Sequence, residues 1–253
     1  MEALILGAGY ATRLYPLTKD RPKPLLPVGD VPILERICRQ LESLPDLNAI
    51  HVVTNHTFAA AYDAWLQGYA RRRSSPPTLA IHDDGSKTPE TRLGAIGDLQ
   101  FVIQRAAIDD DLLVIAGDNL IDAGLEGFVE FARAKGSAVG LKDFQDPDKV
   151  RLYGVVEVND ESRVIGFEEK PAVPRSTLVG VGLYYFPRTS LPLVARYLGQ
   201  GHSKDAPGYY LQWLHRETPL YGYVLDGDWY DIGDLDSYHR ADEQVRRRQL
   251  TRS

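Results

Sequence analysis

The sequence predicts an α/β protein with a Rossmann-like, mostly parallel mixed sheet and helices on both faces. Four short apolar stretches have the length and residue types of buried strands: residues 3–6, 49–54, 78–82 and 112–116. Three stretches with apolar residues at helical spacing lie between them: residues 33–41, 58–69 and 91–108. Strands that alternate with helices are typical of a parallel sheet covered on both sides.

The second half of the chain is richer in strands. Further strands are predicted at residues 137–142, 154–158, 164–168, 179–186 and 221–225. Helices are predicted at residues 125–134, 191–197, 209–214 and 235–247, and a loop at residues 71–77. We expect a single domain over residues 1–253, in which residues 1–145 form the main core and residues 146–253 add a smaller strand-rich part.

Charge and composition exclude several classes of protein. The formal net charge of −6 argues against a nucleic-acid surface, so the arginine clusters at residues 71–73 and 246–248 are expected on solvated faces. The single cysteine, Cys38, excludes an internal disulfide and a Cys-rich zinc site, and its place on an apolar helix stripe predicts a core thiol. No apolar run approaches the ~18 residues of a membrane span, so a cytoplasmic enzyme or binding protein is expected.

Small residues follow the first strand, where that strand ends at Leu6. They leave backbone N–H groups free to point at one anion: Gly7, Ala8, Gly9 and Ala11. Three polar side chains follow that suit phosphate oxygens: Thr12, Arg13 and Lys23. The stretch is interpreted as a polyphosphate-binding loop, and the alternative is a tight turn with surface cations.

Two carboxylates are candidates for a magnesium site. Asp118 comes directly after the apolar strand 112–116, at the sheet edge where ligands bind in such folds. Asp231 lies between an aromatic pair and Gly233. The alternative for Asp231 is a capping role at the last helix, although Asp234 or Asp236 could take that role instead.

The strand-rich half contains residues suited to a phosphorylated sugar. The carboxylate of Glu169 can accept hydrogen bonds from hydroxyl groups, and Lys170 can neutralise a phosphate. Gly154 and Gly182 would let a ring approach the backbone. Each of these residues alone is also ordinary in a surface strand or turn.

Taken in order, these motifs resemble the sugar-1-phosphate nucleotidylyltransferase family, most closely its glucose-1-phosphate thymidylyltransferase branch. The matching segments span almost the whole chain: residues 7–14, 23–28, 117–119, 153–157, 168–171, 182–184 and 229–233. The resemblance implies a nucleotide-binding core in residues 1–145 and a sugar-phosphate-binding part in residues 146–253. It also implies Mg²⁺-dependent transfer of a nucleoside monophosphate from an NTP, dTTP or UTP, to a sugar 1-phosphate such as glucose 1-phosphate.

The resemblance also assigns roles to residues. Arg13 and Lys23 are implied as the catalytic cations, Arg13 at the leaving pyrophosphate and Lys23 at the triphosphate. Asp118 and Asp231 are the implied magnesium ligands. Nucleotide contacts are implied for Leu6, Gly7, Ala8, Gly9, Thr12, Arg13, Lys23 and Gly94, and sugar-phosphate contacts for Asn119, Gly154, Glu169, Lys170 and Gly182.

This sequence departs from the family pattern in three places. Ala8 and Ala11 stand where the family usually has glycine, which is tolerable if neither needs a positive φ. The glutamine-containing stretch of thymidylyltransferases is absent after the third strand, although Gly94 fits the backbone position near the base, so the base stays open. We also expect no C-terminal extension of the kind that the allosterically regulated, tetrameric members carry, and a homodimer is compatible with the sequence.

Three alternatives remain at this point. A cytidylyltransferase for another phosphorylated acceptor has a related loop, and a non-catalytic nucleotide or sugar-phosphate sensor could keep the same fold. A dinucleotide-dependent oxidoreductase is disfavoured, because the spacing Gly7-x-Gly9-x-x-Thr12 lacks the small third residue of that fingerprint.

Overall fold

A central sheet organises the structure, a computed structural model that describes residues 1–72 and 77–252. Within these residues, nine strands form one sheet whose main path runs β10-β9-β11-β6-β1-β4-β5, with β8 joining β11 to β12. The strands are β1 (Glu2–Leu6), β4 (Ala49–Thr54), β5 (Thr78–Asp83), β6 (Leu112–Ala116), β8 (Ala138–Asp143), β9 (Gly154–Val158), β10 (Val164–Glu169), β11 (Leu178–Phe186) and β12 (Tyr221–Val224).

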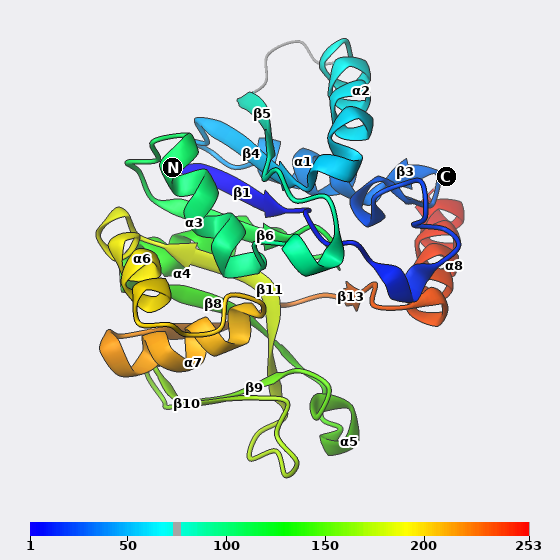
Figure 1. Cartoon of the computed structure of the whole chain (residues 1–253). Helices are drawn as coiled ribbons and strands as arrows, with labels where there is room; N and C mark the ends of the chain where they lie inside the picture. The colour runs from blue at the N-terminus through cyan, green and yellow to red at the C-terminus, as the bar shows by residue number, and fades with distance from the viewer. Residues whose placement is uncertain (73–76, 253) are drawn as a thin grey trace.

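The pairing of the strands confirms the expected mixed sheet. The core strands β6, β1, β4 and β5 are parallel to one another. Strand β11 runs antiparallel to β6 and begins the strand-rich part. Strands β9 and β10 pair antiparallel beyond β11. Figure 1 shows β9, β10 and the short helix α5 (Pro147–Val150) at one end of the molecule, far from β4, β5 and α2 at the other.

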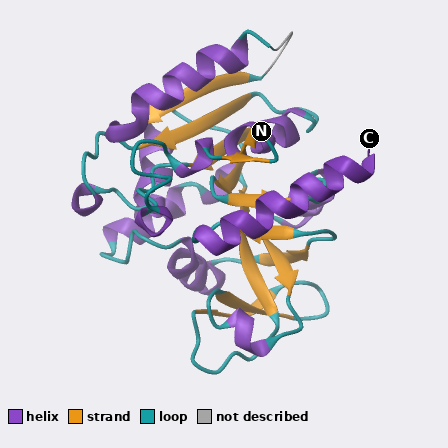
Figure 2. Cartoon of the chain, turned by 90° about the vertical axis from the view of Figure 1, so that its right-hand side faces the viewer, coloured by secondary structure: helices purple, strands orange, loops and turns teal. Residues whose placement is uncertain are grey.

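Helices cover both faces of the sheet, as the sequence predicts. One apolar core contains residues of α1 (Ile33–Glu42), α2 (Ala59–Ala70), α4 (Glu126–Lys135) and α8 (Leu235–Arg252). The other contains residues of α3 (Ala95–Arg105), α6 (Pro192–Gly199) and α7 (Pro207–Glu217). Successive residues of β1 enter alternate cores, Ala3 and Ile5 the first and Leu4 the second, because strand side chains alternate between faces. In Figure 2, α8 lies across the side that faces the viewer.

Two small strand pairs were not expected from the sequence. Strand β2 (Pro27–Val28) pairs with β3 (Val31–Pro32), and β7 (Asn119–Ile121) pairs with β13 (Trp229–Asp231). Such strands are too short to show a two-residue period, and β7 and β13 are far apart in the sequence.

The helix predicted at residues 91–108 is shorter than expected. Residues Pro89–Thr91 form a separate 3₁₀ turn, and α3 begins only after Gly94, whose φ of +79° lies outside the helical region.

The composition-based expectations have mixed outcomes. Cys38 is fully buried in the first core, which confirms the core thiol. Arg71 and Arg72 are exposed as expected, whereas Arg73 and most of the predicted loop 71–77 lie outside the described residues. The cluster at residues 246–248 does more than face solvent, because Arg246 and Arg248 make ion pairs with aspartates of other segments. Among the described residues, no helix combines the length and apolar character needed to span a bilayer.

Candidate active site

A cleft of about 710 Å³ lies beyond the carboxyl ends of β1 and β6, at the edge predicted from the sequence. These strands are parallel neighbours with Leu6 opposite Ala116, so the loops that follow them emerge side by side. The cleft is lined by all the predicted site residues except Thr12: Leu6, Gly7, Ala8, Gly9, Arg13, Lys23, Gly94, Asp118, Asn119, Gly154, Glu169, Lys170, Gly182 and Asp231. Thr12 is exposed at the start of the 3₁₀ helix η1 (Thr12–Leu14) and is not among the lining residues.

The loop after β1 is held by hydrogen bonds to its carbonyl groups. The Tyr62 hydroxyl donates to the carbonyl of Gly7 at 3.0 Å, and the Asn55 amide donates to that of Ala8 at 2.9 Å. A Cβ at Gly7 would lie 2.7 Å from the Tyr62 hydroxyl, so this position requires glycine, whereas one at Gly9 would meet nothing within 4 Å. The loop is therefore anchored on its inner side and has open space at Gly9.

Ala11 contradicts the assumption under which alanine would be tolerated in this loop. Its φ of +48° and ψ of 42° place it in the left-handed region, where a Cβ is strained. The Thr18 hydroxyl donates to the Ala11 carbonyl at 2.8 Å and so helps to hold this conformation. Ala8 has no positive φ and satisfies the assumption.

Lys23 and Asp118 meet at the inner end of the cleft. The Lys23 ammonium donates to a carboxylate oxygen of Asp118 at 2.8 Å and to the carbonyl of Ile232. The Asn119 amide donates to the other oxygen of Asp118 at 2.9 Å, and the Trp229 indole N–H donates to the Asn119 side-chain oxygen. Residues from three separate segments are thus joined in one hydrogen-bonded network.

Asp231 reaches the same place through the β7–β13 pair. The antiparallel register sets Asp231 opposite Asn119, the residue that follows Asp118. Burial raises the pKa of Asp231 to about 6, and the negative charge of Asp118 adds to this shift, whereas Lys23 and Arg13 oppose it. The neighbouring positive charges therefore compensate only part of the cost of ionising this carboxyl.

The pair Asp118 and Asp231 fits a magnesium ion. The described residues contain no group of three or more His, Cys, Asp or Glu side chains that could hold a metal. Mg²⁺ commonly binds one or two carboxylates and completes its coordination with waters and substrate phosphates, so two carboxylates at an open cleft suffice. The capping alternative for Asp231 is wrong, because Asp234 caps α8 by accepting the Ser237 N–H at 2.8 Å.

The opposite wall of the cleft comes from the strand-rich part. Burial raises the pKa of Glu169, and the positive charge of Lys170 opposes that shift. A Cβ added at Gly208 would overlap the Glu169 carboxylate, and one at Gly154 would lie 3.0 Å from it. The lack of a side chain at Gly154 and Gly208 therefore leaves space for the Glu169 carboxylate. A Cβ at Gly182 would lie 2.7 Å from the Asn119 amide nitrogen.

The loop before α7 closes the cleft near Gly94. The N–H groups of Ala95 and Ile96 donate to the carbonyls of Asp205 and Lys204, at 3.3 and 2.9 Å. A Cβ at Gly94 would lie 2.6 Å from the Lys204 carbonyl oxygen, so packing against this loop already requires glycine there.

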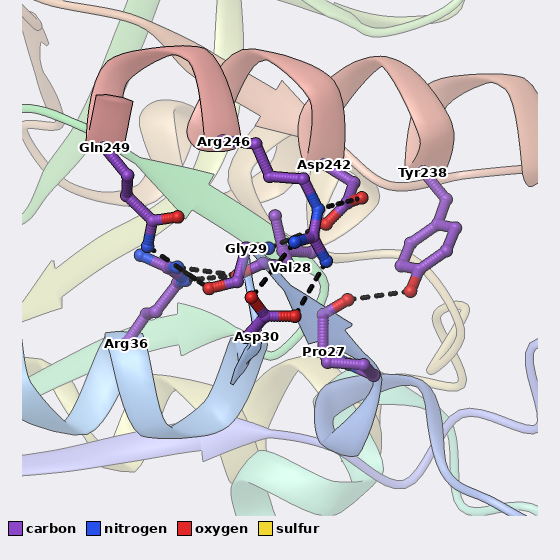
Figure 3. Close-up of polar contacts among 9 residues, drawn as sticks. All are labelled: Pro27, Val28, Gly29, Asp30, Arg36, Tyr238, Asp242, Arg246 and Gln249. Carbon is purple, nitrogen blue, oxygen red and sulfur yellow. Dashed lines mark hydrogen bonds and ion pairs between the residues drawn. The ribbon is translucent and has the colours of Figure 1, made fainter. Parts of the chain in front are cut away.

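Helix α8 links the Asp231 segment to the Lys23 segment at the inner end of the cleft. It begins four residues after Asp231, and its side chains hold the β2–β3 turn that follows the Lys23 segment (Figure 3). The Tyr238 hydroxyl donates to the Pro27 carbonyl at 2.7 Å, and the Gly29 N–H donates to Asp242 at 2.7 Å. Arg246 adds a two-pronged ion pair with Asp30.

Several cleft residues were missed from the sequence. Trp229 lies two residues before Asp231 in β13, but a strand of three residues shows no period that could have indicated it. Asp98 lies one helical turn after Gly94, and this spacing could have indicated it. Arg92 and Asp205 line the cleft and form an ion pair at 3.3 Å, and they have no such signal because Asp205 comes from a distant loop.

Fold and cleft define an α/β protein whose main cleft opens where parallel strands end and a glycine-containing loop begins. The family model described as "Nucleotidyl transferase" matches residues 2–248. The chain therefore belongs to the nucleotidyl transferase family.

Curated relatives agree with this assignment. A UTP--glucose-1-phosphate uridylyltransferase of Synechocystis sp. is 30% identical over 261 residues, which cover 99% of this chain and 64% of that protein. The uridylyltransferase AglF of Haloferax volcanii is 32% identical over 187 residues, covering 74% of this chain and 72% of its own. The bifunctional protein GlmU of Methanocaldococcus jannaschii is 30% identical over 239 residues, covering 92% and 51%. The chain spans about half to two thirds of the length of several curated relatives that it matches.

A solved structure shows the same fold. The crystal structure of an apo UDP-glucose pyrophosphorylase superposes with a TM-score of 0.79 at 19% identity and covers 98% of each chain.

Proposed function

We propose that this protein transfers a nucleoside monophosphate from an NTP to a sugar 1-phosphate and releases pyrophosphate. The preferred pair is UTP or dTTP with glucose 1-phosphate. The observation that carries the proposal is the single cleft in which Lys23, Asp118 and Asp231 lie on one wall and Glu169 and Lys170 on the other. A phosphate-binding end that faces a carboxylate and a cation suits two phosphorylated substrates.

The reaction needs alignment and neutralisation of charge more than proton transfer. A phosphate monoester has a second pKa near 6, so the sugar 1-phosphate is largely dianionic at neutral pH and needs no general base. Its oxygen forms a bond to the α-phosphorus of the NTP while the bond to the β-phosphate oxygen breaks, and the electron pair leaves with pyrophosphate. Two anions must be held in line for this step.

Each wall of the cleft has a part in this alignment. Backbone N–H groups of residues 7–11 and the guanidinium of Arg13 would bind the triphosphate and the leaving pyrophosphate. Lys23 would hold the α-phosphate, and its bonds to Asp118 and Ile232 fix the ammonium in place. Lys170 would bind the attacking phosphate.

Other groups would orient the sugar. Glu169, with the room given by Gly154 and Gly208, would accept hydrogen bonds from sugar hydroxyls. Asn119 is held by Trp229 and would contact the same substrate. Gly182 keeps this part of the wall open.

Asp118 and Asp231 would hold Mg²⁺ in the cleft. When bound, the ion supplies Lewis-acid neutralisation of the reacting phosphates. The raised pKa of Asp231 supports this assignment, because a carboxyl that is costly to ionise gains from a cation beside it.

A pyrophosphate-release assay tests the proposal. The protein is incubated with Mg²⁺ and glucose 1-phosphate, against dTTP, UTP, CTP and GTP in separate reactions. We expect release with UTP or dTTP that depends on both the sugar phosphate and Mg²⁺. Release without the sugar phosphate would indicate a hydrolase. No release with any of the four, nor with mannose 1-phosphate or N-acetylglucosamine 1-phosphate as acceptor, would favour the sensor.

A further inference from the structure

The buried carboxyl of Asp98 lies beside the half-buried carboxyl of Asp84, at the end of the cleft near Gly94. Asp98 of α3 is only 6% exposed and lines the cleft. Asp84 follows β5, and its Oδ1 accepts the N–H of Ser86 at 2.7 Å. The other oxygen of Asp84, Oδ2, and the Oδ1 of Asp98 are both buried, and no donor from the described residues reaches either atom.

Neither oxygen has a donor in the part of the chain that the structure describes, and the Asp84 carboxyl lies within hydrogen-bonding reach of the Asp98 side chain. A buried acceptor without a donor is costly, and two of them at neighbouring carboxylates would add charge repulsion. The cost disappears if Asp98 is protonated and donates to Asp84. Burial raises the pKa of Asp98 to about 8, and the charge of Asp84 and its hydrogen bond with Asp98 add to the shift, whereas Lys204 opposes it. At neutral pH the Asp98 carboxyl therefore keeps its proton and can donate it in a hydrogen bond.

The two carboxyl groups lie at the two ends of a segment that forms part of the cleft wall. Asp84 stands at the start of residues 84–94, and Asp98 lies one turn beyond the end, with its N–H bonded to the Gly94 carbonyl at 2.8 Å. Within this segment Arg92 and Gly94 line the cleft. Separation of the two carboxyls would release the start of the segment from α3.

We propose that Asp98 is a positioning residue for the nucleotide, because by donating a hydrogen bond to Asp84 it fixes residues 84–94 as a wall of the cleft. The inference rests on the proposed function only for the choice of ligand. Loss of the shared proton would place two negative charges side by side and loosen this wall. Nucleotide affinity should then fall as the pH rises, although neither carboxyl takes part in the chemistry.

Other charged groups also affect the ionisation of Asp98. Asp84 and Lys204 act on Asp98 directly, and the ion pair of Arg92 with Asp205 lies on the same wall. Their contributions are common to the wild type and to Asp98→Asn. The difference in the pH dependence of Kd between these two proteins therefore measures the effect of the shared proton.

Titration calorimetry with UTP, dTTP, CTP and GTP at pH 7.5 first selects the triphosphate that binds most tightly. Its Kd is then measured at pH 7.5, 8.5 and 9.5, a range in which the phosphate groups are already ionised. If only the protonated form of Asp98 is competent to bind, the wild-type Kd rises about 20-fold between pH 7.5 and 9.5. In Asp98→Asn the amide donates to Asp84 at every pH, so the Kd should change less than about threefold.

Two further variants sharpen the test. Asp98→Ala removes the donor, so binding should be weak at all three pH values and show no step. Glu90→Gln changes an exposed acid of the same segment and should keep the wild-type profile. Circular dichroism at each pH confirms that every variant is folded, and Asp98→Asn carries the test if Asp98→Ala does not fold.

The outcomes separate this inference from the proposed function. A wild-type Kd that does not change with pH, or the same step in Asp98→Asn, would overturn the positioning role even in an active enzyme. The expected profile in a protein without turnover would support the positioning role and overturn only the proposed transfer. Failure of all four triphosphates to bind would overturn both.

Discussion

Replacing Asp231 by asparagine should abolish turnover and at the same time stabilise the metal-free protein. The side chain keeps its shape and loses its charge, so an assigned magnesium ligand is lost. Removal of one such electrostatic contact at a phosphoryl-transfer site costs about 10²–10³ in rate. The expected fall in kcat is therefore at least about 100-fold, with the fold intact.

The stability change follows from the pKa of the same group. Burial and Asp118 raise the pKa of Asp231 from 3.8 to about 6. Each pKa unit corresponds to about 1.4 kcal/mol, so ionising this carboxyl in the folded protein costs roughly 3 kcal/mol more than in the unfolded chain. Because Asp231 is partly open to the cleft, we expect about 1–3 kcal/mol of stabilisation in Asp231→Asn.

The sign of the pH dependence is fixed by the direction of the shift. Below about pH 4 the carboxyl is protonated in both states and contributes nothing. Between about pH 4 and 6 the folded state holds the proton more tightly, so wild-type stability falls as the pH rises, and above pH 6 the loss is complete. Asparagine does not titrate, so its advantage should appear over this interval and then stay constant.

Urea unfolding of both proteins at pH 4, 6 and 8 with EDTA measures this difference, and steady-state kinetics with Mg²⁺ measures the turnover. Asp236→Asn, which removes an exposed charge in the first turn of α8, serves as the matched control and should change neither quantity substantially. Wild-type activity in Asp231→Asn would refute the metal assignment. A loss of stability at pH 8 would refute the electrostatic reasoning.

Three other substitutions follow from the geometry. Ala11→Gly should relieve the positive φ and raise the free energy of unfolding by up to about 1 kcal/mol, with activity unchanged, as thermal unfolding would show. Gly182→Ala should displace Asn119 and destabilise the protein by about 1–3 kcal/mol, with a larger rise in KM for the sugar phosphate than for the NTP; equal rises would contradict the assigned wall. Asp242→Ala removes the acceptor of the Gly29 N–H and should cost about 1–2 kcal/mol, which urea unfolding measures, and an unchanged midpoint would show that α8 does not hold the β2–β3 turn.

The sequence predicted the sheet and the helices because their signals are local. Strand β6 matches its predicted bounds, and α4 begins and ends within one residue of the bounds predicted for it. These segments have enough residues to show a two- or 3.6-residue period. The same reasoning placed the loop after Leu6 and the loop after Ala116 at one edge, and the cleft lies there.

What the sequence could not predict depends on contacts between distant segments. The β7–β13 pair brings Asp231 to Asp118, yet each strand has only three residues and no period to read. The left-handed conformation of Ala11 depends on Thr18 and on the start of η1, and alanine itself does not indicate it. The proton shared by Asp84 and Asp98 arises from burial, which appears only once α3 is packed.

The most direct test of the account follows the α-phosphate of the nucleotide. The protein is supplied with Mg²⁺, glucose 1-phosphate and UTP or dTTP labelled at the α-phosphorus, and the labelled products are separated. We predict that the label appears in a nucleoside diphosphate sugar in a one-to-one ratio with released pyrophosphate, and that added pyrophosphate returns it to the triphosphate. Label that appears in the free nucleoside monophosphate, or stays in the triphosphate with every sugar 1-phosphate supplied, would contradict it.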